Sequence, residues 1–135
     1  MSGTFQIRGG KRLQGEITPQ GAKNEALQIL CAVLLTDEEV RIKNIPDIHD
    51  VNRLIEILAD FGVKVTKNGH GDYTFKADSV NFDYVKSEEF KKDGAKLRGS
   101  IMLMGPMLAR YGEAYMPTPG GDKIGRRRLD THFQG

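Results

Sequence analysis

Apolar positions in residues 22–35 recur with the period of an α-helix, which predicts a largely buried helix beginning near Lys23 and Asn24. The positions on its apolar face are Ala26, Leu27, Leu30, Val33 and Leu34. The next stretch, EEVRIKNI at 38–45, alternates between apolar and polar residues as a half-buried strand does. A helix followed by a strand is therefore expected here.

The segment 46–62, PDIHDVNRLIEILADFG, predicts a second helix, with Asp47 or Asp50 as its N-cap and Gly62 at its C-terminal stop. Residues 63–77 form two alternating runs around an Asn68-Gly69 turn, which predicts a β-hairpin. With Glu16 to Thr18 as a first strand, the order is βαβαββ.

The same pattern restarts at an offset of 74 residues, so the chain contains an internal repeat. After a linker near 78–94, Leu27 falls on Ile101 and Asn24 falls on Arg98. Two equivalent helix starts thus carry Lys23-Asn24 and Arg98. Because helix N-termini attract anions, these side chains could converge on an anionic ligand; alternatively, they are solvated helix ends.

The second repeat contains an insertion. The first copy needs about six residues to reach its second helix, whereas the second needs about twelve between Thr118 and Asp130. The extra residues are essentially GGDKIGRR at 120–127, rich in glycine and charge. Such an insertion on a repeat scaffold is typical of a mobile functional loop.

Composition limits the function classes. The 135 residues carry a net charge of only +2, too small for a protein that coats nucleic acid, so any anion site must be local. The longest apolar runs are about half the length of a membrane span and no signal peptide is evident, which predicts a cytoplasmic protein without a membrane partner. Cys31 lies in an apolar run and is expected to be buried and inert, and the three scattered histidines predict no metal site.

Four ordered segments resemble the UDP-N-acetylglucosamine enolpyruvyl transferase family: LQGEITPQGAKNEALQIL at 13–30, NIPDIHDVNRLIEILADFGVKV at 44–65, LRGSIMLMGPMLARYG at 97–112 and PGGDKIGRRRLDTH at 119–132. The sister family, enolpyruvylshikimate phosphate synthase, typically has Gly-Ser-Lys-Ser where this chain has Gly-Ala-Lys-Asn. The resemblance implies an α/β fold of repeated βαβαββ units in an inside-out α/β barrel, incomplete in this chain. Residues 1–20 would be a strand segment that completes a second domain, and 21–135 a partial catalytic domain.

The resemblance also implies an activity without a cofactor. The family transfers the enolpyruvyl group of phosphoenolpyruvate to the 3'-hydroxyl of UDP-N-acetylglucosamine, releasing phosphate, in the first committed step of peptidoglycan synthesis. By their match to family positions, the residues expected at phosphoenolpyruvate are Lys23, Asn24 and Arg127, with Lys23 also catalytic. Those expected at UDP-N-acetylglucosamine are Arg98, Arg127, Arg128, Leu129, Asp130 and Thr131. The usual family motif there reads Arg-Pro-Val-Asp-Leu, from which this chain departs at Arg128, Leu129 and Thr131.

A further departure concerns Asp122, which stands where most family members have the cysteine that protonates phosphoenolpyruvate and is alkylated by fosfomycin. Some branches of the family carry aspartate there, so Asp122 is the expected proton donor. A carboxyl group can be a general acid when burial or a neighbouring anion raises its pKa from about 3.9. Lys123, Arg126 and Arg127 would act in the opposite direction until anionic substrates neutralise them.

The sequence also allows other hypotheses about function. The triplet Arg126, Arg127 and Arg128 could bind nucleic acid, although it lacks interleaved aromatic residues and nucleic acid is not the expected partner. An enolpyruvylshikimate phosphate synthase-like activity and a non-catalytic anion-binding role are the remaining alternatives. The family's second-domain residues are absent from these 135, so the chain alone is expected to be inactive and to self-associate through unpaired edges.

Overall fold

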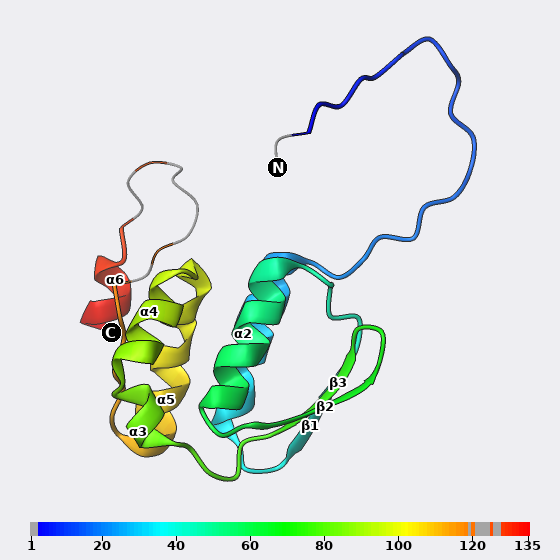
Figure 1. The fold of residues 1–135 in the computed structure, drawn as a ribbon. Coiled ribbons are helices and arrows are strands. Elements are labelled where there is room, and N and C mark those ends of the chain that lie inside the picture. The colour runs from blue at the N-terminus through cyan, green and yellow to red at the C-terminus, as the bar shows by residue number, and fades with distance from the viewer. Residues whose placement is uncertain (1–2, 119, 121–124, 126–127) are drawn as a thin grey trace.

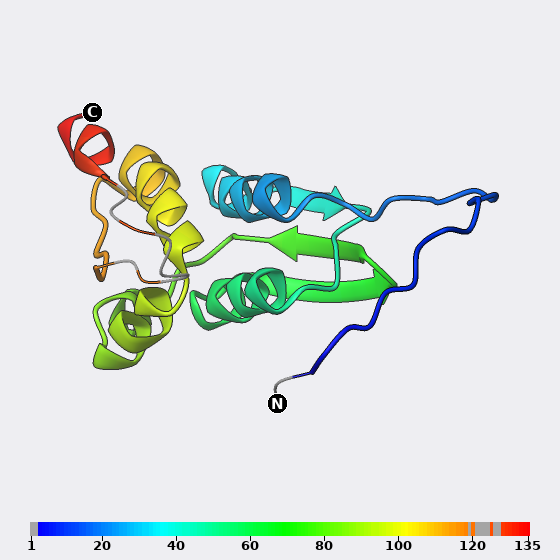
Figure 2. The same cartoon turned by 90° about the horizontal axis from the view of Figure 1, so that it is seen from above.

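The computed structural model describes residues 3–118, 120, 125 and 128–135. Two helices, α1 (Lys23–Ala32) and α2 (His49–Asp60), lie side by side against a small antiparallel sheet (Figures 1 and 2). A second helical group, formed by α3 (Phe82–Val85), α4 (Glu88–Ala95) and α5 (Met104–Tyr111), packs beside the first. No helix in the described part of the chain is long and apolar enough to span a membrane.

The sheet contains β1 (Glu39–Ile42), β2 (Lys64–Gly69) and β3 (Asp72–Lys76) in the order β1-β3-β2. Val40 and Val65 both pair with Phe75, which is fully buried, so this face of the sheet meets the helices. The other face is polar, as the alternating sequence predicted. There the Arg41 side chain donates two hydrogen bonds to the Asp72 carboxylate, at 2.9 and 2.8 Å.

The two predicted helices are present, but the predicted N-cap of the second is wrong. The helix α2 begins at His49, and Ile48 occupies its cap position without a capping side chain. Asp47 instead accepts a hydrogen bond from Asn52 Nδ2 at 2.8 Å, and Asp50 lies inside the first turn. The C-terminal prediction is confirmed, because Gly62 follows the helix with φ of 100°, a left-handed conformation that favours glycine.

The predicted hairpin is confirmed, but its turn lies at His70-Gly71 rather than Asn68-Gly69. Asn68 lies at an irregularity in β2 between the paired residues Lys67 and Gly69, and its side chain donates to Thr74 Oγ1 at 2.8 Å. Gly71 adopts φ of 63°, and a Cβ there would lie 2.8 Å from the backbone oxygen of Ile45. Position 71 of the turn therefore requires a glycine, because the backbone of the 44–46 segment passes close to it.

The second copy of the repeat keeps its helix but not its strand. The expected linker folds as α3 and α4, and the repeated helix begins as a 3-10 helix, η2 (Arg98–Leu103), before it continues as α5. No strand forms over 113–118, because this segment packs on α4 instead: a Cβ on Gly94 would lie 2.6 Å from Pro117 Cγ.

The predicted strand at Glu16–Thr18 is also wrong for this structure. Residues 3–20 run as an extended, exposed segment away from the helices (Figure 1). A strand requires a neighbouring strand to satisfy its backbone groups, and no described residue pairs with this segment. The side chains of Phe5 and Ile17 are consequently about 90% exposed (94% and 90%).

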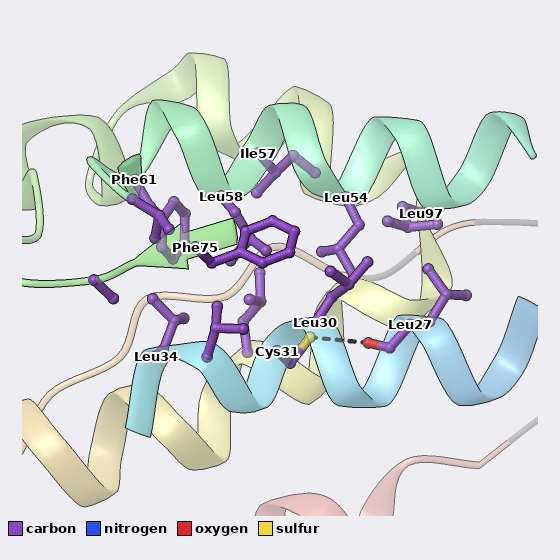
Figure 3. Close-up of a cluster of buried hydrophobic side chains, with 14 of the residues drawn as sticks. Leu27, Leu30, Cys31, Leu34, Leu54, Ile57, Leu58, Phe61, Phe75 and Leu97 are labelled. Carbon is purple, nitrogen blue, oxygen red and sulfur yellow. Dashed lines mark hydrogen bonds between the residues drawn. The ribbon is translucent and has the colours of Figure 1, made fainter. Parts of the chain in front are cut away.

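The core lies between α1, α2 and the inner face of the sheet (Figure 3). Leu30, Leu54 and Leu58 are fully buried there and pack around Phe75. Cys31 is buried in the same layer, and its Sγ–H donates to the backbone oxygen of Leu27 at 3.2 Å. Burial raises the pKa of the Cys31 thiol to about 12, so the predicted buried, inert thiol is confirmed.

Candidate active site

The site begins where α1 and α2 start. The two helices run in the same direction, as the order Leu27 to Leu34 and Leu54 to Phe61 in Figure 3 shows, so their N-termini lie at the same end of the molecule. Lys23 is the first residue of α1, and its Nζ forms an ion pair with Asp50 Oδ2 in the first turn of α2. The predicted helix start at Lys23 is confirmed. The ion pair of Lys23 with Asp50 was not predicted from the sequence.

The third element of the site is η2, which packs against α1. A Cβ on Gly99 would lie only 3.2 Å from Leu27 Cδ1, so the absence of a side chain at Gly99 permits this approach. Leu97, on the other side of Arg98, is buried and fixes the start of η2 in the core. Arg98 is therefore held near the N-terminus of α1, as the repeat predicted.

These elements surround a cleft of about 320 Å³. Its described lining residues are Lys23, Asn24, Leu27, Gln28, Asp50, Leu97, Arg98, Gly99, Ile101, Met102, Arg128, Leu129 and His132. Lys23, Arg98 and Arg128 supply positive charge, and Asp50 is the one acidic residue among the lining residues that the structure describes. Such a cleft suits a ligand with phosphate or carboxylate groups.

The structure does not bring all the predicted residues to this cleft. Lys23, Asn24, Arg98, Arg128 and Leu129 line it, whereas Asp130 and Thr131 face a neighbouring hollow that shares Arg128. Arg128 Nε donates to Asp130 Oδ2 at 2.6 Å, at the start of α6 (Asp130–Gln134). The predicted Asp122 and Arg127 lie outside the described residues.

Several lining residues were not among the predicted site residues, including Gln28, Asp50, Met102 and His132. Gln28 follows Asn24 by four positions, so helical spacing places it on the same face, and this signal was present in the sequence. His132 comes only from the folding of α6 against the cleft, which local pattern does not predict. Among the described residues, no three His, Cys, Asp or Glu side chains gather as a metal would require.

A larger hollow of about 770 Å³ lies elsewhere, between α4 and residues 114–118. Its lining is mainly apolar, with two lysines: Lys91 Nζ lies 2.6 Å from Glu88 Oε1, and Lys86 Nζ lies 3.8 Å from Glu113 Oε1. We assign the site to the smaller cleft because its cationic side chains come from three separate elements.

Comparison with known proteins decides the family. Residues 7–135 match EPSP synthase (3-phosphoshikimate 1-carboxyvinyltransferase). The chain belongs to this family. The predicted enolpyruvyl transferase resemblance and fold class are confirmed. Among solved structures, the enolpyruvyl transferase NikO from Streptomyces tendae is similar, with a TM-score of 0.55 and 26% identity over 77% of this chain and 23% of that one.

Curated relatives within this family are closer in sequence. The chain is 61% identical to UDP-N-acetylglucosamine 1-carboxyvinyltransferase of Bacteroides thetaiotaomicron and 58% identical to that of Porphyromonas gingivalis. The enzyme of the same name from Borreliella burgdorferi is 44% identical. Each match covers 98% of this chain, and the chain spans about 30% of the length of each relative.

Proposed function

We propose that this chain supplies part of the active site of a UDP-N-acetylglucosamine 1-carboxyvinyltransferase. The reaction transfers the enolpyruvyl group of phosphoenolpyruvate to the 3'-hydroxyl of UDP-N-acetylglucosamine and releases phosphate. The observation that carries the proposal is the meeting of Lys23, Asn24 and Arg98 at one cleft, in a chain 61% identical to enzymes of this name. The pathway would be peptidoglycan synthesis in the cytoplasm.

The chemistry of the substrates supports this assignment. Phosphoenolpyruvate carries a phosphate and a carboxylate, and UDP-N-acetylglucosamine carries a diphosphate. The Arg98 guanidinium presents a planar fork that suits such oxygens, and the Lys23 ammonium acts as a point charge. Each can neutralise charge that increases as the leaving phosphate separates, which is the main electrostatic contribution available to such a site.

The roles proposed within the reaction combine these positions with the family resemblance, which alone supports the roles of Asp122 and Arg127. Lys23 and Asn24 would contact phosphoenolpyruvate and its tetrahedral adduct, while Arg98, Arg128 and Leu129 would contact the sugar nucleotide. Asp122 would donate a proton to C3 of phosphoenolpyruvate, Arg127 would contact both substrates, and Asp130 and Thr131 would complete the nucleotide pocket. For Asp130, the ion pair with Arg128 would have to rearrange when the nucleotide binds.

The test is phosphate release from phosphoenolpyruvate by the protein extended to the length of its curated relatives. Release that depends on UDP-N-acetylglucosamine, and that falls at least 100-fold in Lys23→Ala, is expected from the loss of a charged group at the reacting centre. Arg41→Ala is the matched control, since Arg41 lies on the outer face of the sheet. No dependence on UDP-N-acetylglucosamine would contradict the proposal.

A second activity is favoured by one observation, the match to 3-phosphoshikimate 1-carboxyvinyltransferase. That reaction uses the same phosphoenolpyruvate chemistry on a different acceptor. Shikimate 3-phosphate in place of the sugar nucleotide therefore separates the two activities in the same assay. Turnover with shikimate 3-phosphate alone would assign the second activity.

A further inference from the structure

The ion pair between Lys23 and Asp50 is unusual for its place. Both side chains line the candidate cleft, and they are only partly exposed, at 37% and 34%. Such half-exposed pairs add little to folding stability, because solvent screens the attraction and two side chains lose freedom. The pair is therefore not explained as a contribution to the fold.

Asp50 also has no role in capping its own helix. It lies within the first turn of α2, and no side chain caps that helix. A carboxylate in a cleft built to hold anions repels the ligand, so by charge alone Asp50 opposes binding. The charge of Asp50 complements the dipole at the start of α2, but this small effect does not account for its contact with Lys23 in the cleft.

We infer that Asp50 is a positioning residue, which holds the Lys23 ammonium at the wall of the cleft between α1 and η2. The inference rests on the proposed function, since Lys23 is the residue assigned there to phosphoenolpyruvate. Asp50 would act through Lys23 and would not itself contact the reacting atoms.

The geometry of the two helices explains how this works. An unconstrained lysine side chain has four rotatable bonds and samples many rotamers, so fixing it when a ligand binds costs conformational entropy. Asp50 has a short side chain on a helix that is anchored by the fully buried Val51 and Leu54, so its carboxylate has a much smaller range of positions than the lysine ammonium. The ammonium is thereby placed before the substrate arrives, which lowers the cost of binding and of reaching the reactive geometry.

The test is a double-mutant cycle with Lys23→Met, Asp50→Asn and the two combined, in the protein at the length of its relatives. Asp50→Asn is expected to lower kcat/KM for phosphoenolpyruvate by about tenfold, within the coupling range of residues in contact. In the Lys23→Met background, the same substitution is expected to cause no loss of kcat/KM, because Asp50 then only repels the anionic ligand. Asp50→Glu, which keeps the charge, is expected to restore most of the activity, and Asp47→Asn serves as a matched control at the same helix start.

The outcomes are distinct. A wild-type protein without turnover would show that the proposed function is wrong, and the inference would fall with it. With an active wild type, equal losses from Asp50→Asn in both backgrounds would overturn the inference alone, because replacing a residue that acts through Lys23 causes no loss once Lys23 is gone. The inference would also be overturned if Asp50→Asn lowered both kcat/KM and the melting temperature, and if Asp50→Glu did not restore kcat/KM.

Discussion

Arg110 Nη1 donates to the backbone oxygen of Ala77 at 2.6 Å, and so joins α5 to the end of the sheet. The same nitrogen lies 3.1 Å from the oxygen of Leu34 and 2.9 Å from that of Thr36. One half-buried guanidinium thus connects α5 to the residues that follow α1 and to the residue that follows β3. Local sequence pattern gave no sign of this contact, which spans more than thirty residues in each case.

Replacing Arg110 by methionine should destabilise the fold by about 2–4 kcal/mol, because three backbone carbonyls lose a charged donor while the apolar stem remains. The measurement is the free energy of unfolding from urea titration. Arg53→Met is a useful comparison, since Arg53 pairs with the side chains of Asp93 and Glu56 rather than with the backbone. Equal losses in the two variants would contradict the special role of Arg110.

The pKa of Asp72 should depend on Arg41. Hydrogen bonds from Arg41 lower the pKa of Asp72 from 3.8 to about 2. A carboxylate with a lowered folded pKa adds stability above its unfolded pKa and loses it as the pH falls, here between about 4 and about 2. NMR titration should place the midpoint of Asp72 near 2 in the wild type and close to its ordinary value in Arg41→Ala. An unchanged midpoint would show that Arg41 is not the cause.

Cys31 should resist thiol reagents in the folded protein. Burial raises its pKa to about 12, so almost no thiolate exists at pH 8, and the sulfur is also inaccessible. Labelling with iodoacetamide should be undetectable over an hour under native conditions and complete in denaturant. Rapid labelling of the folded chain would mean that α1 opens readily.

Asp122 is expected to be the proton donor, so its substitutions should separate acid chemistry from charge. Asp122→Asn should lower kcat by 10² to 10⁴, the usual contribution of a positioned general acid, with phosphoenolpyruvate binding retained. Asp122→Cys should keep turnover and become sensitive to alkylation by fosfomycin. Both effects are measured as phosphate release by the protein at the length of its relatives. Full activity of Asp122→Asn would show that Asp122 is not the proton donor.

Sequence predicted those parts of the fold that depend on local periodicity. The start of α1 at Lys23, the stop of α2 at Gly62 and the hairpin all follow from spacing or from a backbone conformation that only certain residues adopt. Part of the candidate site was predicted in the same way, because the internal repeat places Arg98 at a helix start equivalent to that of Asn24.

The errors arose where tertiary contacts override local preference. Asp50 is a good N-cap residue by type, yet its carboxylate turns to Lys23 on another helix. The turn moved to Gly71 because the neighbouring 44–46 segment approaches too closely for a side chain there. Glu16–Thr18 has strand-like alternation but no partner strand among the described residues. None of these contacts can be derived from neighbouring residues in sequence.

We expect the cleft between α1 and η2 to bind the sugar nucleotide. The most direct measurement is calorimetric titration of UDP-N-acetylglucosamine into the protein at the length of its relatives, comparing wild type, Arg98→Ala and the outer-face control Arg41→Ala. Arg98→Ala should weaken binding at least tenfold, as expected for loss of a charge-assisted contact, and Arg41→Ala should bind as the wild type does. Equal affinity in all three proteins would contradict it.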